Sequence, residues 1–199
     1  MIRRAVGRLV TLVILLSAIP VGAACQHVLI VYHSETGHTA RLADAVAAGA
    51  RGVGGVEVRL VPVDSVSHDD LAWSDALIVG SPVHAANVSS PIMGFLESLP
   101  FNGEMRNKIG AAFVTGGGIS AGEETAQLAI LRGMLVYNMI IVGGPTWTEA
   151  FGASGVTIEP PFGSTATPAA MDSMFVAKGS KLGARVAEVA MLLRGNGGT

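Results

Sequence analysis

Three stretches of small, hydroxyl-bearing and glycine residues each follow a short apolar run, and they are the places where this chain could do chemistry. The first, SETGHT, consists of Ser34, Glu35, Thr36, Gly37, His38 and Thr39. Its hydroxyls and the unpaired amides at the start of a following helix suit an anion, because that helix end carries the positive end of the dipole. The stretch has no Lys or Arg, so amides and hydroxyls alone would neutralise a phosphate monoester. A plain helix start is an equally compatible interpretation.

The second stretch, GSPVHAANVSSPI, spans residues 80–92. Pro82 fixes the backbone there, and Val83, His84 and Ala85 form a thin, mostly apolar ledge on which a flat ring could rest. His84 could donate a hydrogen bond to a ring carbonyl or to a negatively charged ring. A lone loop histidine is more often simply solvated, so both interpretations stay open.

The third stretch, VTGGGISAGEET, spans residues 114–125 and includes Thr115, Gly116, Gly117, Gly118, Ile119 and Ser120. Successive glycines cost chain entropy, and they are useful where a ligand must approach the main chain. The stretch opens into a predicted helix, with Ser120 or Gly122 near its start and acids in the first turn, where the dipole favours them. A flexible connector would have the same composition. Neither GxGxxG nor the P-loop fingerprint is present.

The elements that must position these stretches alternate along the chain. Apolar runs rich in Val and Ile predict strands buried on both faces at residues 28–32, 56–63, 76–80, 109–115 and 139–144. Helix-period stretches lie between or after them, at residues 39–50, 91–99, 122–137 and 169–193. Ser89 or Ser90 before Pro91 predicts a capped helix start. The alternation predicts one α/β domain, a parallel sheet with helices on both faces. Ligands bind at the carboxyl ends of such strands, so we expect all three stretches at one edge.

Residues 1–24 have the composition of a signal peptide or an N-terminal membrane-targeting segment. A basic start is followed by an apolar run and by the small residues GAA, and the run is short for a membrane span. The pair Arg3-Arg4 is also compatible with twin-arginine export. Cys25 is the only cysteine, which excludes an intramolecular disulfide, and its place after GAA is compatible with lipidation or with chance. We therefore expect an exported, periplasmic or membrane-associated protein, or a cytoplasmic one if the leader is not functional.

The domain that follows, residues 26–199, is mildly acidic. The formal net charge of the chain is −2, from 13 basic and 15 acidic residues, and three of the basic residues lie in the leader. A body without a stripe of Lys and Arg has no electrostatic footprint for nucleic acid.

Taken together, residues 27–193 resemble flavodoxin-like proteins, most closely the WrbA-type NAD(P)H:quinone oxidoreductases. The supporting stretches are VLIVYHSETGHTARLADAVAAGA, DALIVGSPVHAANVSSPIMGFLESL, GAAFVTGGGISAGEET, YNMIIVGG and PFGS. The resemblance implies a flavodoxin-like three-layer sandwich with a five-stranded parallel sheet in the order 2-1-3-4-5. It also implies FMN as cofactor, with NAD(P)H as co-substrate and a quinone-like acceptor.

The resemblance assigns roles to the three stretches. Residues 34–39 match the family's phosphate loop, and residues 115–120 fall on its loop along one side of the flavin ring. Val83, His84 and Ala85, after Pro82, fall where the family has Thr-Arg-Phe against the ring. Tyr137 falls about where the family has a histidine near the flavin. No obligatory catalytic residue and no metal ligand is implied; His84 and Tyr137 are candidates for tuning the flavin or supplying a proton.

Departures from the family leave other properties open. His84-Ala85 replaces Arg-Phe and removes an aromatic wall, and the loop between Leu99 and Lys108 is short. Substrate preference and assembly into a dimer or tetramer are therefore undetermined. In the long connection at residues 145–168, Trp147 and Phe151 could roof the ring, pack against a neighbouring subunit, or pack in the core.

The function expected from the resemblance is FMN-dependent, two-electron reduction of quinones by NAD(P)H. A flavodoxin-like FMN electron carrier in the cell envelope is the alternative, although the body is weakly acidic for such a carrier. The third hypothesis is a binding module that holds no flavin. Export conflicts with NAD(P)H as donor, because NAD(P)H is cytoplasmic, so an exported protein would need a membrane quinol or a partner protein as its source of electrons.

Overall fold

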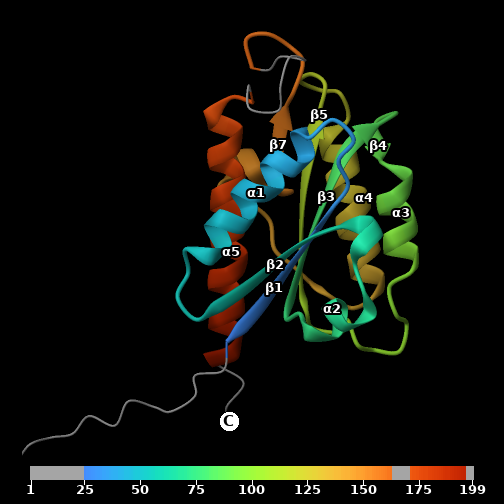
Figure 1. Cartoon of the computed structure of the whole chain (residues 1–199), viewed down its shortest axis with the longest axis vertical. Helices are drawn as coiled ribbons and strands as arrows, with labels where there is room; N and C mark the ends of the chain where they lie inside the picture. Colours follow the sequence, from blue (N-terminus) through green and yellow to red (C-terminus); the bar gives the residue numbers. More distant parts are fainter. Residues whose placement is uncertain (1–24, 163–170, 196–199) are drawn as a thin grey trace, which may run out of the picture.

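The computed structural model of this protein describes residues 25–162 and 171–195, so the predicted leader, residues 1–24, lies outside the described residues. A twisted, mainly parallel sheet forms the middle layer (Figure 1). Its strands are β1 (Gln26–Tyr32), β2 (Val56–Pro62), β3 (Ala76–His84), β4 (Asn87–Val88), β5 (Ile109–Gly116), β6 (Ile140–Ile141) and β7 (Ala153–Val156). The order across the sheet is β2-β1-β3-β5 and then β6 and β7, which both pair with β5. The predicted flavodoxin-like order 2-1-3-4-5 is confirmed.

The fifth position of the sheet is split between two short strands. We predicted a continuous fifth strand at residues 139–144, but only Ile140–Ile141 pairs with the start of β5, opposite Ile109 and Gly110. The chain then leaves the sheet and returns as β7, which pairs with the end of β5 from Phe113 to Gly116. Half of the fifth strand therefore lies inside the segment that we predicted as a loop.

Helices cover both faces of the sheet, as predicted. In chain order they are α1 (His38–Arg51), α2 (His68–Trp73), α3 (Ser90–Glu97), α4 (Glu123–Val136) and α5 (Ser173–Gly195). α1 and α5 lie on one face, and α3 and α4 on the other (Figure 1). Each face has its own apolar core, because alternate residues of β1 point to opposite sides: Val28 and Ile30 to one core, Leu29 and Val31 to the other.

Glycines allow α1 and α5 to pack closely. A Cβ at Gly49 would lie 1.8 Å from the Ser180 carbonyl oxygen, and one at Gly183 would lie 1.9 Å from the Val46 carbonyl oxygen. The two backbones are therefore in direct contact, and this fixes α1, whose first turn borders the predicted phosphate loop.

The short helix α2 is an element that was not predicted from the sequence. It begins with a capping box, in which the Asp70 N–H donates to the Ser67 hydroxyl and the Ser67 N–H donates to the Asp70 carboxylate. The pattern Ser-x-x-Asp was visible in the sequence as a helix start. Among the described residues, no helix combines the length and apolar character that crossing a membrane requires.

Candidate functional site

The loops that follow β1, β3 and β5 lie together at one edge of the sheet, at the upper end of Figure 1. Two hydrogen bonds join them. The hydroxyls of Thr39 and Thr115 lie 2.8 Å apart and are both buried, so they tie the start of α1 to the end of β5. His33 Nδ1 lies 2.9 Å from the Ser89 hydroxyl, which ties the loop after β1 to the loop after β3. The predicted convergence of the three stretches is thus a property of the fold.

The predicted phosphate loop has the geometry of an anion cradle. Gly37, the N-cap of α1, has φ of 88°, and no side chain caps the helix. The Gly37 N–H donates to the Ser34 hydroxyl oxygen at 3.1 Å, which leaves the hydroxyl hydrogen of Ser34 free to donate elsewhere. The amides of the first turn therefore have no side-chain acceptor within the described chain, and they carry the positive end of the helix dipole.

His38 supplies the observation that tests whether a phosphate fits this loop. The residue is 8 % exposed, Nδ1 lies 2.9 Å from the Thr36 hydroxyl, and Nε2 is buried with no hydrogen-bond partner among the described residues. A buried nitrogen without a partner costs about 1–3 kcal/mol. When the Thr36 hydroxyl donates to Nδ1, Nε2 carries the hydrogen and needs an acceptor. A phosphate oxygen is such an acceptor, so the loop fits the phosphate of FMN.

The segment that we predicted as a ledge for a flat ring, Val83 to Ala85, forms part of a tight hairpin. β3 continues through Pro82, Val83 and His84, and Ala85 and Ala86 form the turn, with φ of 49° and 58°. Left-handed backbone is unfavourable for residues with a Cβ, by roughly 1–2 kcal/mol each. The backbone of Gly122 packs directly against this turn, because a Cβ on Gly122 would lie 2.5 Å from Ala86 Cα.

His84, at the hairpin, is an exposed residue. Its Nε2 lies 4.0 Å from the Glu35 carboxylate, and both side chains are largely in solvent. Such a pair contributes little to stability. The ring of His84 also meets the ring of His33 edge-on, with 6.5 Å between their centroids. His84 can therefore turn toward a ligand at low cost.

The glycine loop, residues 116–120, runs along the other side of the same edge. Gly116 is buried, Gly117 and Gly118 are half-buried, and Ile119 and Ser120 are exposed. Ser120 has φ of 62°, and Gly122, with φ of 106°, is the N-cap of α4. No Lys or Arg belongs to any of the three predicted loops, so the groups that this edge offers to an anion are amides, hydroxyls and His38.

Tyr137 is the predicted site residue that the fold does not bring to this edge. It follows the last turn of α4, whose 14 residues span about 21 Å. Its side chain is buried, and its hydroxyl donates to the Leu96 carbonyl at 2.9 Å. Burial, and then the nearby Glu97 carboxylate, raise the pKa of Tyr137 above its usual value of 10.0. Within one chain, Tyr137 is a structural residue.

Trp147 and Phe151 lie in the segment between β6 and β7. Trp147 is 89 % exposed and Phe151 is 40 % exposed, so core packing is wrong for both. The segment runs beside the middle of the sheet, because β6 ends opposite Gly110 and β7 begins opposite Phe113. The two ends of this segment are therefore fixed along β5, before its carboxyl end at Gly116.

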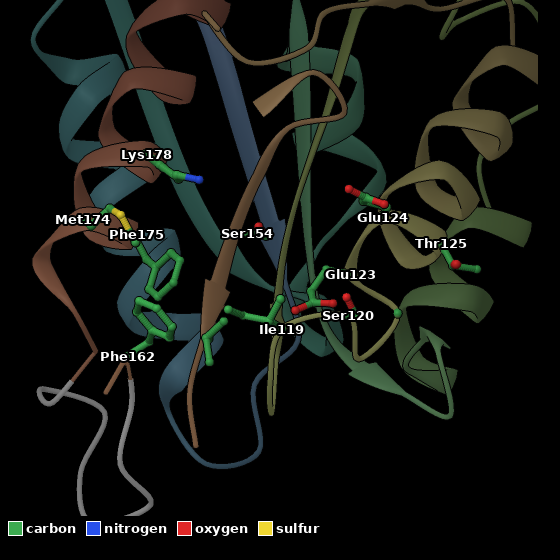
Figure 2. A pocket seen from close by; sticks show the side chains of 12 residues that line it. Ile119, Ser120, Glu123, Glu124, Thr125, Ser154, Phe162, Met174, Phe175 and Lys178 are labelled. Atoms are coloured by element: carbon green, nitrogen blue, oxygen red, sulfur yellow. The ribbon is translucent and has the colours of Figure 1, made fainter. Parts of the chain in front are cut away.

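A pocket of about 500 Å³ borders the glycine loop on the side away from the phosphate loop. Ile119, Ser120 and Glu123 line one wall, and Phe162, Phe175 and Lys178 belong to the other, across β7 (Figure 2). None of residues 34–39 lines it. The pocket is thus a neighbour of the convergent loops and is separate from the phosphate loop.

The comparisons with known proteins agree with this geometry. The family described as NADPH-dependent FMN reductase matches residues 65–153. A protein named NAD(P)H dehydrogenase (quinone) from Methylocella silvestris is 32 % identical over 200 residues, which cover 84 % of this chain and 98 % of that protein. A flavodoxin from Aquifex aeolicus is 36 % identical over 133 residues, covering 63 % of this chain and 72 % of that protein. The chain belongs to the flavodoxin-like family that includes the NAD(P)H dehydrogenases (quinone).

The fold of this flavodoxin-like protein also has solved counterparts. The flavodoxin, WrbA-like protein from Agrobacterium tumefaciens superposes with a TM-score of 0.69 at 22 % identity, over 84 % of this chain and 98 % of that one. FMN is the cofactor that the family implies, and the uncapped α1, the Ser34 hydroxyl and the unpartnered His38 nitrogen fit its phosphate. Val83 to Ala85 and the glycine loop lie at the same edge of the sheet as this phosphate loop.

His33 and the second role of Ser89 were not predicted from the sequence. Ser89 occupies the N-cap position of α3, but it makes no capping bond there, because its hydroxyl is bonded to His33 and lies 3.3 Å from the Ser81 hydroxyl. His33 directly follows the buried strand β1, so its place at this edge could have been expected, whereas Ser89 follows the short antiparallel strand β4 and had no such signal.

Proposed function

We propose that this protein is an FMN-dependent oxidoreductase that reduces quinones by two electrons, with NAD(P)H as donor. The observation that carries the proposal is the convergence of three loops, closed by the Thr39–Thr115 bond of 2.8 Å, around a helix start whose buried His38 nitrogen lacks an acceptor among the described residues. The relatives named NAD(P)H dehydrogenase (quinone) support the reaction class.

When bound, FMN supplies the ring that takes a hydride from a reduced nicotinamide and gives two electrons to a quinone. The chain positions that chemistry. Residues 34–39 would hold the phosphate, the hairpin at Val83 to Ala85 would support the ring, and the amides of Gly117 and Gly118 would be available to it as donors. His84 is the exposed titratable group on the ledge, and it is our candidate for the proton that accompanies quinone reduction.

Steady-state kinetics test this proposal. Purified protein loaded with FMN should oxidise NADH or NADPH when a soluble benzoquinone is present, with rates that saturate in both substrates. A loaded protein that binds FMN but oxidises neither dinucleotide would contradict the enzyme proposal. It would favour the alternative, an electron carrier, for which the 36 % identity to a flavodoxin is the supporting observation.

We also propose that residues 1–24 export or anchor the protein outside the cytoplasm, where a membrane quinol or a partner protein would replace NAD(P)H as electron donor, and that it assembles as a dimer or tetramer. The support for export is the basic start, apolar run and small residues of the leader. Cell fractionation of the full chain, compared with a Cys25→Ser variant, tests export and lipidation. Recovery of both forms in the cytosol would contradict it, and a monomer by light scattering would contradict assembly.

A further inference from the structure

The segment that follows β7 holds the glycine loop from its outer side. The Thr157 N–H donates to the Gly116 carbonyl at 2.9 Å, and the Ile158 and Glu159 N–H groups donate to the Gly117 carbonyl at 3.1 and 2.9 Å. The Thr157 hydroxyl adds a further bond to the Gly116 carbonyl at 3.0 Å. These bonds continue the pairing of β5 with β7 past the end of both strands, so residues 157–159 support the loop.

A charged side chain makes the last of these contacts. The Ile119 N–H donates to Glu159 Oε2 at 2.7 Å, a charge-assisted hydrogen bond, which is shorter and stronger than a neutral one. Gly118 lies directly against this carboxylate, because a Cβ there would be 2.6 Å from Oε2. At Gly117, by contrast, the only atom of the described residues within 4 Å of an added Cβ is Ile158 Cδ1, at 3.6 Å. A side chain at position 118 would thus displace the end of the Glu159 side chain, whereas one at position 117 would not.

The contact also decides which loop amides are free. Among the described residues, the N–H groups of Gly117 and Gly118 have no backbone acceptor, and the N–H of Ile119 is used by Glu159. Two neighbouring amides therefore remain available to a ligand. Glu159 fixes the loop that presents them and also places a negative charge one residue away.

We propose that Glu159 is a positioning residue for the cofactor ring, one that orders the glycine loop before FMN binds and disfavours negative charge on the bound ring. This inference rests on the proposed FMN function. Three successive glycines lose much entropy on ordering, so a loop ordered in advance binds its ligand more tightly. Since reduction adds negative charge to the ring, a fixed carboxylate weakens binding of the reduced form relative to the oxidised form.

Two substitutions separate the ordering effect from the charge effect. Glu159→Gln keeps an oxygen acceptor for the Ile119 N–H but removes the charge, whereas Glu159→Ala removes both. Glu188→Gln, at an exposed carboxylate in the C-terminal half of α5, is the matched charge control. Amide hydrogen exchange of the flavin-free full chain reports on the loop, and FMN titration and the midpoint potential of the loaded protein report on the cofactor.

For Glu159→Ala we expect the exchange protection of Ile119 to fall and the FMN dissociation constant to rise about tenfold. Gly118→Ala should reproduce the loss of protection, because its Cβ displaces the carboxylate. For Glu159→Gln we expect protection and FMN affinity close to those of the parent. Its bound reduced form should be favoured about tenfold, which raises the midpoint potential by about 30 mV for a two-electron couple. Glu188→Gln should change none of these quantities.

Unchanged Ile119 protection in Glu159→Ala would overturn the ordering role, and an unchanged midpoint potential in Glu159→Gln would overturn the charge role. If the parent protein binds no FMN, the proposed function fails and with it the role of Glu159 toward the ring. The exchange measurement on the flavin-free chain still decides whether the carboxylate holds the loop, so the two failures are distinguishable.

Discussion

The hydroxyls of Thr39 and Thr115, 76 positions apart in the chain, are in hydrogen-bond contact at 2.8 Å and are both almost completely buried. Thr39 belongs to the first turn of α1 and Thr115 to the end of β5. The bond therefore joins the loop that would hold a phosphate to the loop that would face the ring. It sets the spacing between the two halves of the site.

The Thr39–Thr115 contact predicts a non-additive pair of substitutions. Thr39→Val or Thr115→Val leaves the other hydroxyl buried without its partner, so each should lower the free energy of unfolding by about 1–2 kcal/mol. The double variant should be more stable than the sum of the single effects by about 1 kcal/mol, as measured by urea unfolding of the flavin-free protein. Thr148→Val is the control, because its bond to Thr146 is exposed. Strict additivity would mean that the two hydroxyls do not interact.

His38 predicts different effects on two flavins. His38→Leu removes a donor to the phosphate, so FMN affinity should fall at least about tenfold, roughly 1.4 kcal/mol. Riboflavin, which has no phosphate, should bind as it does to the parent. Fluorescence titration of the flavin-free protein measures both. His68→Leu, at an exposed histidine of α2, should alter neither affinity. Equal losses for FMN and riboflavin would place His38 away from the phosphate.

Gly122 predicts a backbone requirement at the junction of two loops. Its φ of 106° is unfavourable for other residues, and a Cβ there would meet Ala86 Cα at 2.5 Å. Gly122→Ala should cost about 2–3 kcal/mol of unfolding free energy and weaken FMN binding by displacing the hairpin. Gly94, an exposed glycine within α3, has no atom within 4 Å of an added Cβ. Gly94→Ala should therefore stabilise by about 0.5–1 kcal/mol. Thermal unfolding measures both changes in stability. If both variants were destabilised, or both stabilised, this explanation would be refuted.

Asp70 predicts part of the response to acid. Hydrogen bonds from the Ser67 side chain and backbone, and then from Arg59, hold the pKa of this carboxyl below its usual 3.8. A carboxyl whose pKa is lowered by folding stabilises the protein above the unfolded-state pKa, and the effect is lost as the pH falls through the folded-state value. Asp70→Asn should cost about 1 kcal/mol at neutral pH, because it breaks the capping box of α2. Its unfolding temperature should then fall less steeply than that of the parent below about pH 5. Parallel acid profiles would contradict this assignment.

Much of the fold could be predicted because strands buried on both faces are continuous apolar runs. Val28 to Val31 and Leu77 to Val79 are completely buried, and both runs were identified from the sequence. The prediction of a continuous fifth strand was wrong because the second half of that position is built from Ala153, Ser154 and Gly155, whose small side chains give no strand signal. Pairing with β5, a long-range contact, makes that segment a strand.

The grouping of the three loops was also predictable from the order of the strands. The wrong or missing site residues depend on long-range structure that the local sequence does not show. Loops that follow parallel strands share one edge, so residues 34–39, 83–85 and 115–120 could be grouped without coordinates. Tyr137 was matched by its local position, and the length of α4 carries it away from that edge. Glu159 had no local signal, since its contact with Ile119 depends on how the chain returns after β7.

The measurement that tests the central claim most directly is equilibrium titration of the purified, flavin-free full chain with FMN and with riboflavin. We expect saturable binding of one FMN per chain, at least about tenfold tighter than riboflavin, and a matching loss of FMN affinity in Thr39→Val and Thr115→Val. A chain that is colourless as purified and shows no saturable binding of added FMN would contradict the claim.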